Sequence, residues 1–372
     1  MSKYFGDDVF KLGFGLMRLP KNQYKNIDIK QVCQMVDKFI EAGGTYFDTA
    51  YVYDGGKSEE ATKVALVDRY PRDKYTIATK LNARIATDEQ NAKSQFNISL
   101  SRLGLSYVDY YLLHAIDRNN YQKYDNFHLW EYVKELKEKG LVRYYGFSFH
   151  GDPDLLDELL TKHPDVDFIQ LQINYADWEN PGVASRRCYE IARRHNVSIT
   201  VMEPVKGGFL ANPTDKVKEI FLKANKEMSF ASWAIRYVAS LDGIITVLSG
   251  MSNNEQMDDN LSYMKSFKPL DKQERLVIKE VQEQLEKEKT IKCTACHYCT
   301  EGCPSNIAIP EIFAVKNGEY KRKSWDNGRQ AYAIATFNKG KASSCIECGQ
   351  CEASCPQHLN IIELLKQCVD ME

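Results

Sequence analysis

The chain has 372 residues, of which 43% are hydrophobic and 27% are charged, a balance typical of folded globular proteins. Its formal net charge of -2 excludes the strongly basic composition of chains that bind nucleic acids or membrane surfaces throughout. No apolar run approaches the length of a membrane span, and the first residues lack the apolar core of a secretory signal. We therefore expect a cytoplasmic protein with no nucleic acid and no membrane among its partners.

Short β-rich segments alternate with longer amphipathic segments from the N-terminus to about residue 270. Most of the short segments are almost continuously apolar, as strands buried on both faces of a parallel sheet should be. The predicted strands are residues 12–17, 44–50, 75–80, 108–114, 142–148, 168–174, 198–204 and 243–250.

The segments between these strands have the pattern of helices. In residues 27–44, for example, Val32, Val36 and Phe39 fall on one face and Gly43 ends the pattern. Eight strands with about eight helices over roughly 250 residues match the size of a (β/α)8 barrel. An open doubly wound sheet usually begins with a Gly-rich turn, which this chain lacks, so we predict an α/β fold with a TIM barrel in residues 1–270.

Ionisable side chains stand at the carboxyl ends of three consecutive predicted strands. Asp48 and then Tyr53 follow the second strand, Lys80 ends the third and His114 ends the fourth. Catalytic residues of TIM barrels lie at these strand ends, so the four side chains should converge. Each alone has a plain structural alternative, namely a core aromatic, a solvent-facing lysine or a core histidine. Together they favour a catalytic site.

The segments FDTAYVY, IATK and YYLLH resemble, in order and spacing, the catalytic residues of the aldo/keto reductases. The resemblance runs from about residue 12 to residue 261 and implies an NAD(P)H-dependent oxidoreductase acting on a small-molecule carbonyl or alcohol. It implies that Tyr53 is the general acid, that Lys80 lowers its pKa, that Asp48 pairs with Lys80, and that His114 orients the carbonyl. An ammonium beside a tyrosine favours the phenolate, so the implied lowering also has a physical reason.

The same resemblance implies contacts to a nicotinamide cofactor. Ser148 and Gln170 match the positions that hold the carboxamide, and Asn174 is a neighbour that shares this role. The loop after the seventh strand resembles one that closes over the pyrophosphate, where glycines allow close approach and a lysine offers charge. The implied contacts in this loop are Glu203, Lys206, Gly207 and Gly208.

A further group of implied contacts follows the eighth strand. Gly250, Ser252 and Gln256 lead into a helix whose N-terminus is suited to an anion, and Asp259 and Asn260 match the adenine contacts of the family. Many NADPH-preferring members carry basic residues near the first and third of these positions, and this chain does not. NADP and NAD therefore both remain open, and a flavin is possible because such barrel sites also bind flavin mononucleotide.

Residues 271–290 are predicted to form a charged helix that packs on the barrel and connects it to a second domain in residues 291–372. Within this domain, residues 316–341 carry seven basic residues against two acidic ones. We interpret this stretch as a solvated surface. The alternative is a docking patch for an acidic electron-transfer partner.

Two cysteine runs in this second domain read C-x2-C-x2-C-x3-C-P, the spacing with which bacterial ferredoxins hold 4Fe-4S clusters. The fourth cysteine of each run ligates the other cluster in two-cluster ferredoxins. The first predicted cluster is held by Cys293, Cys296, Cys299 and Cys355. The second is held by Cys345, Cys348, Cys351 and Cys303. A zinc ribbon seldom repeats such a run. Disulfides are disfavoured because eight of the 11 cysteines lie in these two short runs. We therefore predict a small α-rich ferredoxin-like domain.

A barrel joined to such a domain resembles a subgroup of aldo/keto reductases with a C-terminal two-cluster domain. Hydride transfer moves two electrons, whereas each cluster moves one, so the clusters could exchange electrons with an external ferredoxin or flavodoxin, stabilise the fold, or sense oxidation. The main hypothesis is a reductase with electron transfer through the clusters. The alternative is an electron-transfer protein, or a flavin-linked, ferredoxin-dependent reductase, whose barrel is a docking and cofactor scaffold.

Overall fold

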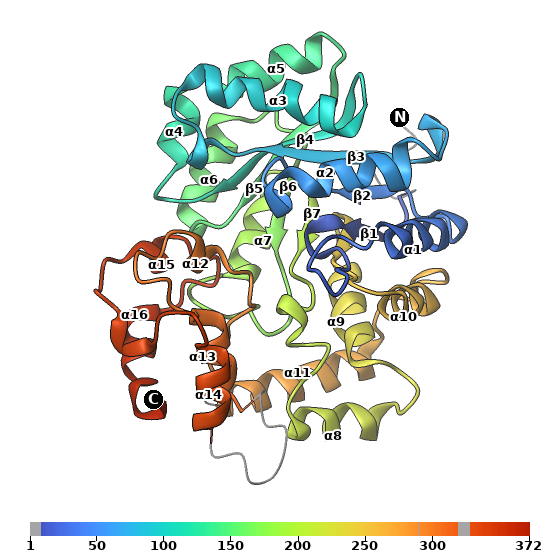
Figure 1. The fold of residues 1–372 in the computed structure, drawn as a ribbon. Helices are drawn as coiled ribbons and strands as arrows, with labels where there is room; N and C mark the ends of the chain where they lie inside the picture. Colours follow the sequence, from blue (N-terminus) through green and yellow to red (C-terminus); the bar gives the residue numbers. More distant parts are fainter. Residues whose placement is uncertain (1–8, 289, 319–327) are drawn as a thin grey trace.

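A computed structural model describes residues 9–288, 290–318 and 328–372 of the chain (Figure 1). Part of the basic stretch predicted from the sequence, including Lys321, Arg322 and Lys323, lies outside the described residues. The docking patch considered for that stretch therefore stays a prediction.

Eight parallel strands close into a barrel in the order of the sequence. Each strand lies within a predicted segment or extends beyond it by no more than two residues, so the predicted (β/α)8 barrel is confirmed. The strands are β1 (Leu12–Gly15), β2 (Tyr46–Asp48), β3 (Thr76–Leu81), β4 (Val108–Ile116), β5 (Val142–Phe149), β6 (Phe168–Gln172), β7 (Ser198–Met202) and β8 (Ile244–Ser249).

The pairing of β5 with β6 shows how tightly the strands approach one another. Gly146 of β5 pairs with Phe168 of β6, and a Cβ atom at this glycine would lie 2.1 Å from the carbonyl oxygen of Phe168. Only glycine permits this approach. The same register sets Ser148 level with Gln170, so both residues lie near the carboxyl end of the barrel.

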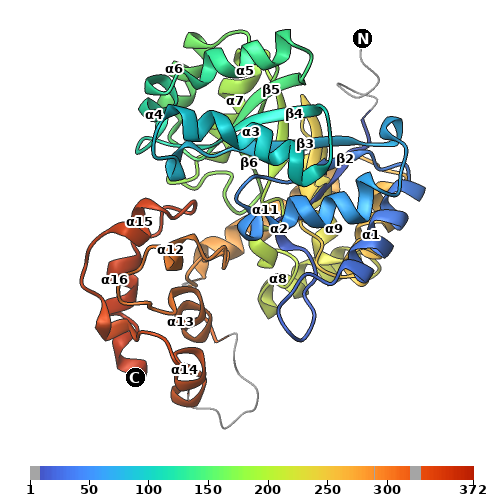
Figure 2. The ribbon, with the colours of Figure 1, turned by 45° about the horizontal axis from the view of Figure 1, so that its top comes forward.

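Helices cover the outside of the barrel (Figures 1 and 2). The helices of this layer are α1 (Ile29–Glu41), α2 (Lys57–Thr62), α3 (Glu89–Leu103), α4 (Tyr121–Asn126), α5 (Leu129–Glu138), α6 (Pro153–Lys162), α7 (Ser185–Arg194), α8 (Asp215–Ala224), α9 (Phe230–Ala239) and α10 (Asn254–Met264). In α1 the predicted apolar face is buried, and Asp28 caps its first turn by accepting from the Gln31 amide at 3.1 Å. No helix in the described ranges is long and apolar enough to cross a membrane.

Helix α11 (Lys272–Lys287) connects the barrel to the rest of the chain and packs on α8. A capping box starts it, since Asp271 and Glu274 each accept a backbone hydrogen bond from the other residue, at 2.8 and 2.9 Å. It buries Val277 and Val281 among the side chains of the barrel core. The predicted packing of this connecting helix is thus observed.

The C-terminal part is small and helical and has a hydrophobic core of its own, built around residues such as Ile312, Phe313 and Tyr332. It lies at one end of the barrel in both views (Figures 1 and 2). Its helices are α12 (Tyr298–Glu301), α13 (Ile309–Lys316), α14 (Arg329–Ala335), α15 (Gln350–Ala353) and α16 (Ile361–Lys366).

Candidate active site

The structure brings the four ionisable side chains at the strand ends together. The Lys80 Nζ atom lies 2.5 Å from the Asp48 carboxylate and 3.3 Å from the Tyr53 hydroxyl. The ring of His114 meets the ring of Tyr53 edge to face, with 5.7 Å between the centroids. One carboxylate, one ammonium, one phenol and one imidazole therefore share the carboxyl end of the barrel.

The short turn after β2 that carries Tyr53 packs against α3 through the side chain of Arg102. Its backbone has positive φ angles at Asp54, Gly55 and Gly56, which the two glycines adopt without strain. The guanidinium of Arg102 packs under Gly56, where a Cβ atom would lie 2.4 Å from it. Arg102 also donates to the carbonyl of Tyr51 at 3.0 Å, so the position of Tyr53 is fixed by contacts outside the site itself.

Lys80 is fully buried, and every hydrogen bond of its ammonium goes to the site. Besides Asp48 and Tyr53, it donates to the Thr49 carbonyl at 2.7 Å. The other oxygen of Asp48 accepts from the Gln170 amide at 3.1 Å. Burial lowers the pKa of Lys80 and raises that of Asp48, and the ion pair between them opposes both shifts.

The predicted lowering of the pKa of Tyr53 is wrong for this arrangement. Burial raises the pKa of Tyr53 well above its usual value near 10, and the carboxylates of Asp48 and Glu203 add to the rise. The charge of Lys80 is largely offset by Asp48, with which it is paired. Burial, with help from Lys80, also holds the pKa of His114 well below 6.5. At neutral pH Tyr53 therefore keeps its proton and His114 is uncharged.

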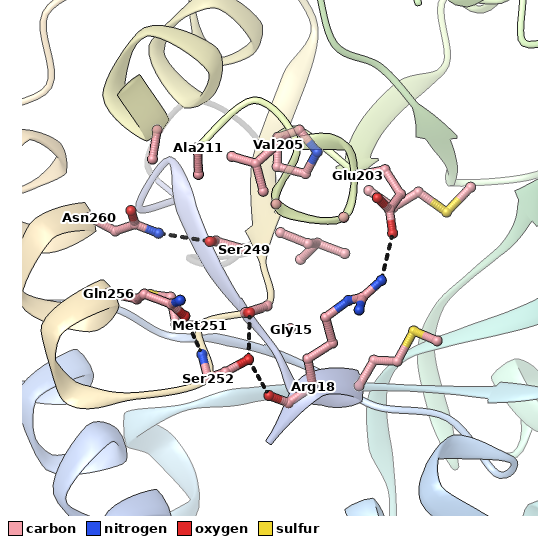
Figure 3. A pocket seen from close by; sticks show the side chains of 18 of the residues that line it. Gly15, Arg18, Glu203, Val205, Ala211, Ser249, Met251, Ser252, Gln256 and Asn260 are labelled. Atoms are coloured by element: carbon pink, nitrogen blue, oxygen red, sulfur yellow. Dashed lines mark hydrogen bonds and ion pairs between the residues drawn. The ribbon is translucent and has the colours of Figure 1, made fainter. Parts of the chain in front are cut away.

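A cavity of about 780 Å³ opens beside these residues (Figure 3). It runs between the ends of β1, β7 and β8, and its size suits a small-molecule ligand or cofactor. Tyr53 and Asp48 stand in its wall together with most of the predicted cofactor contacts, namely Gln170, Glu203, Gly207, Gly208, Gly250, Ser252, Gln256, Asp259 and Asn260.

Two helices begin at the wall of this cavity. Ser229 caps α9 and Asn253 caps α10, and each side chain accepts a hydrogen bond from its own helix. Farther along α10, Asn260 donates to the Ser249 hydroxyl at 2.7 Å and so ties the helix to β8 (Figure 3). The N-terminal ends of helices carry partial positive charge, so this part of the cavity suits phosphate groups.

Two predicted carboxamide contacts lie outside the cavity wall because their polar atoms serve the barrel. The Ser148 hydroxyl accepts from the amide of Ala115, the residue of β4 that follows His114, at 2.7 Å. The Asn174 amide donates to Asp177 at 2.8 Å and to the Glu203 carbonyl at 3.1 Å. Of the three residues predicted at this position, Gln170 is therefore the one that faces the cavity.

The predicted role of Lys206 as a positive charge for phosphate is not what the structure shows. Its buried ammonium lies 2.5 Å from the Asp177 carboxylate and 2.6 Å from the Gln357 side-chain oxygen. The lysine thus joins the loop after β7 to the C-terminal part of the chain. Its two partners lie 29 and 151 residues away along the chain, which is why the sequence did not reveal this role.

Arg18 and Met17, which the sequence analysis missed, also line the cavity. Arg18 points towards Glu203, with 3.9 Å between the charged groups (Figure 3). It also donates to the Thr294 carbonyl at 3.1 Å. Among the residues described in the cavity wall, Arg18 is the one with a basic side chain. The only feature of the sequence that could have indicated Arg18 is its position directly after the first predicted strand, residues 12–17.

The cysteine thiols of the two runs surround two cavities in the C-terminal part. The first cavity is lined by Cys293, Cys296, Cys299 and Cys355. The second is lined by Cys303, Cys345, Cys348 and Cys351. Each set takes three cysteines from one run and the fourth from the other, the grouping expected for two clusters. Most of the other residues in both walls are apolar, and four thiols per cavity fit one 4Fe-4S cluster each.

The same thiols do not suit the alternatives. All 11 cysteines are free, so no disulfide framework is formed. In the described part of the chain, no three His, Cys, Asp or Glu side chains are close enough together to bind a single metal ion. A four-iron cluster is larger than one ion and matches thiols that stand around a cavity.

Two family models match the chain one after the other. The aldo/keto reductase family matches residues 11–283, and a 4Fe-4S dicluster domain matches residues 292–360. The first match spans all eight strands and the second spans both cysteine runs. The predicted combination of a reductase barrel with an iron–sulfur domain is thereby confirmed.

Relatives and solved structures agree with these matches. The uncharacterized oxidoreductase YqkF of Bacillus subtilis is 27% identical over 289 residues, 68% of this chain and 87% of that protein. The D-galacturonate reductase of Fragaria ananassa is 25% identical over 281 residues, 69% and 83% of the two chains. The holo form of aldo-keto reductase AKR11C1 from Bacillus halodurans covers 73% of this chain and 91% of its own, with a TM-score of 0.57 and 24% identity. A Klebsiella pneumoniae aldo-keto reductase in complex with NADPH covers 74% and 91%, with a TM-score of 0.60 and 19% identity.

Replacing Asp48 by asparagine should lower the free energy of unfolding by about 3–5 kcal/mol, because the buried Lys80 ammonium loses its partner. Anaerobic urea unfolding of the cluster-loaded protein measures this loss. Asp258→Asn is the control, since the 2.6 Å ion pair of Asp258 with Lys38 is exposed and such pairs contribute less than about 1 kcal/mol. Equal losses in the two variants would contradict the dependence of Lys80 on Asp48.

Proposed function

The chain belongs to the aldo/keto reductase family, and from this premise we propose that it reduces a carbonyl group of a small molecule, or oxidises the corresponding alcohol, with a nicotinamide cofactor. The observation that carries the proposal is the contact of Tyr53 with the Lys80–Asp48 ion pair at the wall of a ligand-sized cavity. The nicotinamide cofactor is further supported by the NADPH named for the Klebsiella pneumoniae structure.

A bound nicotinamide supplies the hydride, which carries two electrons to the carbonyl carbon. The Tyr53 hydroxyl gives its proton to the carbonyl oxygen, and its raised pKa keeps that proton in place until the reaction needs it. Lys80, 3.3 Å from the hydroxyl, stabilises the phenolate that remains. Neutral His114 orients the carbonyl by a hydrogen bond. In alcohol oxidation the Tyr53 phenolate takes the proton back.

The lining of the cavity favours NADH over NADPH. We place the nicotinamide end near Tyr53 and Gln170 and the adenosine end near α10, where Glu255 and Asp259 stand in the wall. Carboxylates bind ribose hydroxyls but repel the additional phosphate of NADPH. The Gln256 position, which faces this end, carries no charge to offset them.

The iron–sulfur domain gives the reductase a path for single electrons. A 4Fe-4S cluster passes one electron at a time, whereas a nicotinamide gives up two electrons together as a hydride, so the clusters exchange electrons with a one-electron donor rather than directly with the nicotinamide. The first set of cysteines belongs to the loops that contact the barrel, through Thr294 and Gln357. In the second set Cys348 is exposed. We propose that an external one-electron carrier of the ferredoxin or flavodoxin type meets the chain at this second set.

Replacing Tyr53 by phenylalanine should lower kcat for aldehyde reduction by about 100-fold or more, because the proton donor is removed. Cofactor affinity, followed by fluorescence, and cluster absorbance should not change. Tyr46→Phe is the matched control, since Tyr46 is a buried barrel tyrosine whose hydroxyl has no partner among the described residues. Full activity of the Tyr53 variant would rule out this tyrosine as the acid.

Replacing Gln256 by arginine should tighten NADPH binding about tenfold, or about 1.4 kcal/mol, with little effect on NADH, because the new guanidinium faces the additional phosphate. Equilibrium titrations of both cofactors measure this shift. Gln90→Arg, which adds the same charge at an exposed position of α3, should leave both affinities unchanged. Tighter NADPH than NADH binding in the wild-type protein would refute the proposed preference.

Anaerobic addition of reduced flavodoxin, which gives up one electron per molecule, should reduce both clusters, with loss of cluster absorbance and appearance of an electron paramagnetic resonance signal. In Cys348→Ser, which removes one thiol of the second set, one cluster should still be reduced. Cys188→Ser, a buried thiol outside the runs, should behave like the wild type. Clusters that accept electrons from dithionite but not from reduced flavodoxin would disprove the proposed meeting of a one-electron carrier with the second set.

A further inference from the structure

The first cysteine run lies across the mouth of the barrel. On one side, Arg18 from the segment after β1 donates a hydrogen bond to the Thr294 carbonyl at 3.1 Å. On the other side the Thr294 backbone packs on Gly207, where a Cβ atom would lie 2.4 Å from the Thr294 oxygen. Because Arg18 and Gly207 both line the large cavity, the turn around Thr294 bridges two of its walls.

Tyr298 extends this bridge as far as Met17, a residue of the cavity wall. Its hydroxyl lies 3.8 Å from the sulfur of Met17, which lines the cavity together with Tyr53. On its other side Tyr298 shares a small cavity of about 40 Å³ with Ala115 and His150, the residues that follow His114 and β5. The aromatic side chain thus stands between the β1 segment and the loops after β4 and β5.

The contacts of Tyr298 leave its hydroxyl without a strong partner. A thioether is a weak acceptor, so the contact with Met17 satisfies the phenol only partly. The position of the ring is therefore set mainly by packing between Met17 on one side and Ala115 and His150 on the other.

We propose that Tyr298 contacts the substrate and sets the size of the carbonyl compound that reaches Tyr53. The iron–sulfur domain then supplies one wall of the active site in addition to its clusters. This inference rests on the proposed carbonyl reductase function, and it specifies the substrate class as compact aldehydes and ketones with at most one ring. Compounds with two linked rings should be excluded by the Tyr298 side chain.

The test compares benzaldehyde with biphenyl carbaldehyde as substrates of the cluster-loaded enzyme. Tyr298→Ala should raise kcat/KM for the larger aldehyde about tenfold relative to the smaller one, because the blocking ring is gone. Tyr298→Phe keeps the ring and should keep the wild-type ratio. Phe337→Ala, the loss of an aromatic side chain that is 75% exposed in the same domain, should also keep it. An unchanged ratio in Tyr298→Ala would overturn the proposal.

Two further measurements keep the proposal testable if the wild-type enzyme is inactive or if the Tyr298→Ala variant loses its clusters. If the wild type reduces neither aldehyde, the proposed carbonyl reductase function fails. In that case, fluorescence titration of the same aldehydes tests whether Tyr298 forms a wall of the binding site. Tyr298→Ala should then bind the biphenyl compound about tenfold more tightly than the wild type does, and equal affinities would overturn the proposal. If Tyr298→Ala loses cluster absorbance, Met17→Ala opens the same space from the barrel side. It should shift the ratio in the same direction, and no shift would again overturn the proposal.

Discussion

The buried ammonium of Lys80 is the constraint on which the catalytic end of the barrel depends. A charge without solvent requires several partners, and the end of β2 with the turn after it supplies three, namely Asp48, the Thr49 carbonyl and the Tyr53 hydroxyl. Satisfying the lysine also aligns the site. The second oxygen of Asp48 accepts from the Gln170 amide, and the Tyr53 hydroxyl lies within 3.3 Å of the ammonium. One desolvated charge therefore orders side chains from β2, β3 and β6.

A second buried charge, that of Lys206, connects the two parts of the molecule. Its pairing with Asp177 and Gln357 places the loop after β7 against the segment that follows Cys355. That cysteine lines the same cavity as the first cysteine run, although about fifty residues separate them along the chain. The loop over the cofactor cavity and the first thiol set are therefore parts of one packed unit.

The features that the sequence predicted are those encoded by local spacing. Apolar runs located the strands, and three short segments located Asp48, Tyr53, Lys80 and His114. The cysteine repeats likewise carry their own geometry. What the sequence could not reveal depends on burial or on distant partners. The pKa of Tyr53 rises because the site is desolvated, and no pattern of residues around position 53 displays that.

The bridge across the mouth has a consequence for how the protein matures. A ribosome delivers the barrel strands first and Thr294 and Tyr298 afterwards, so the barrel has an open mouth when it folds. The contacts of Thr294 with Arg18 and Gly207 form only after the first cysteine run has emerged and reached the barrel. If the two thiol sets hold the clusters that they fit, closure of the mouth depends on the supply of iron and sulfide as well as on the folding of the barrel.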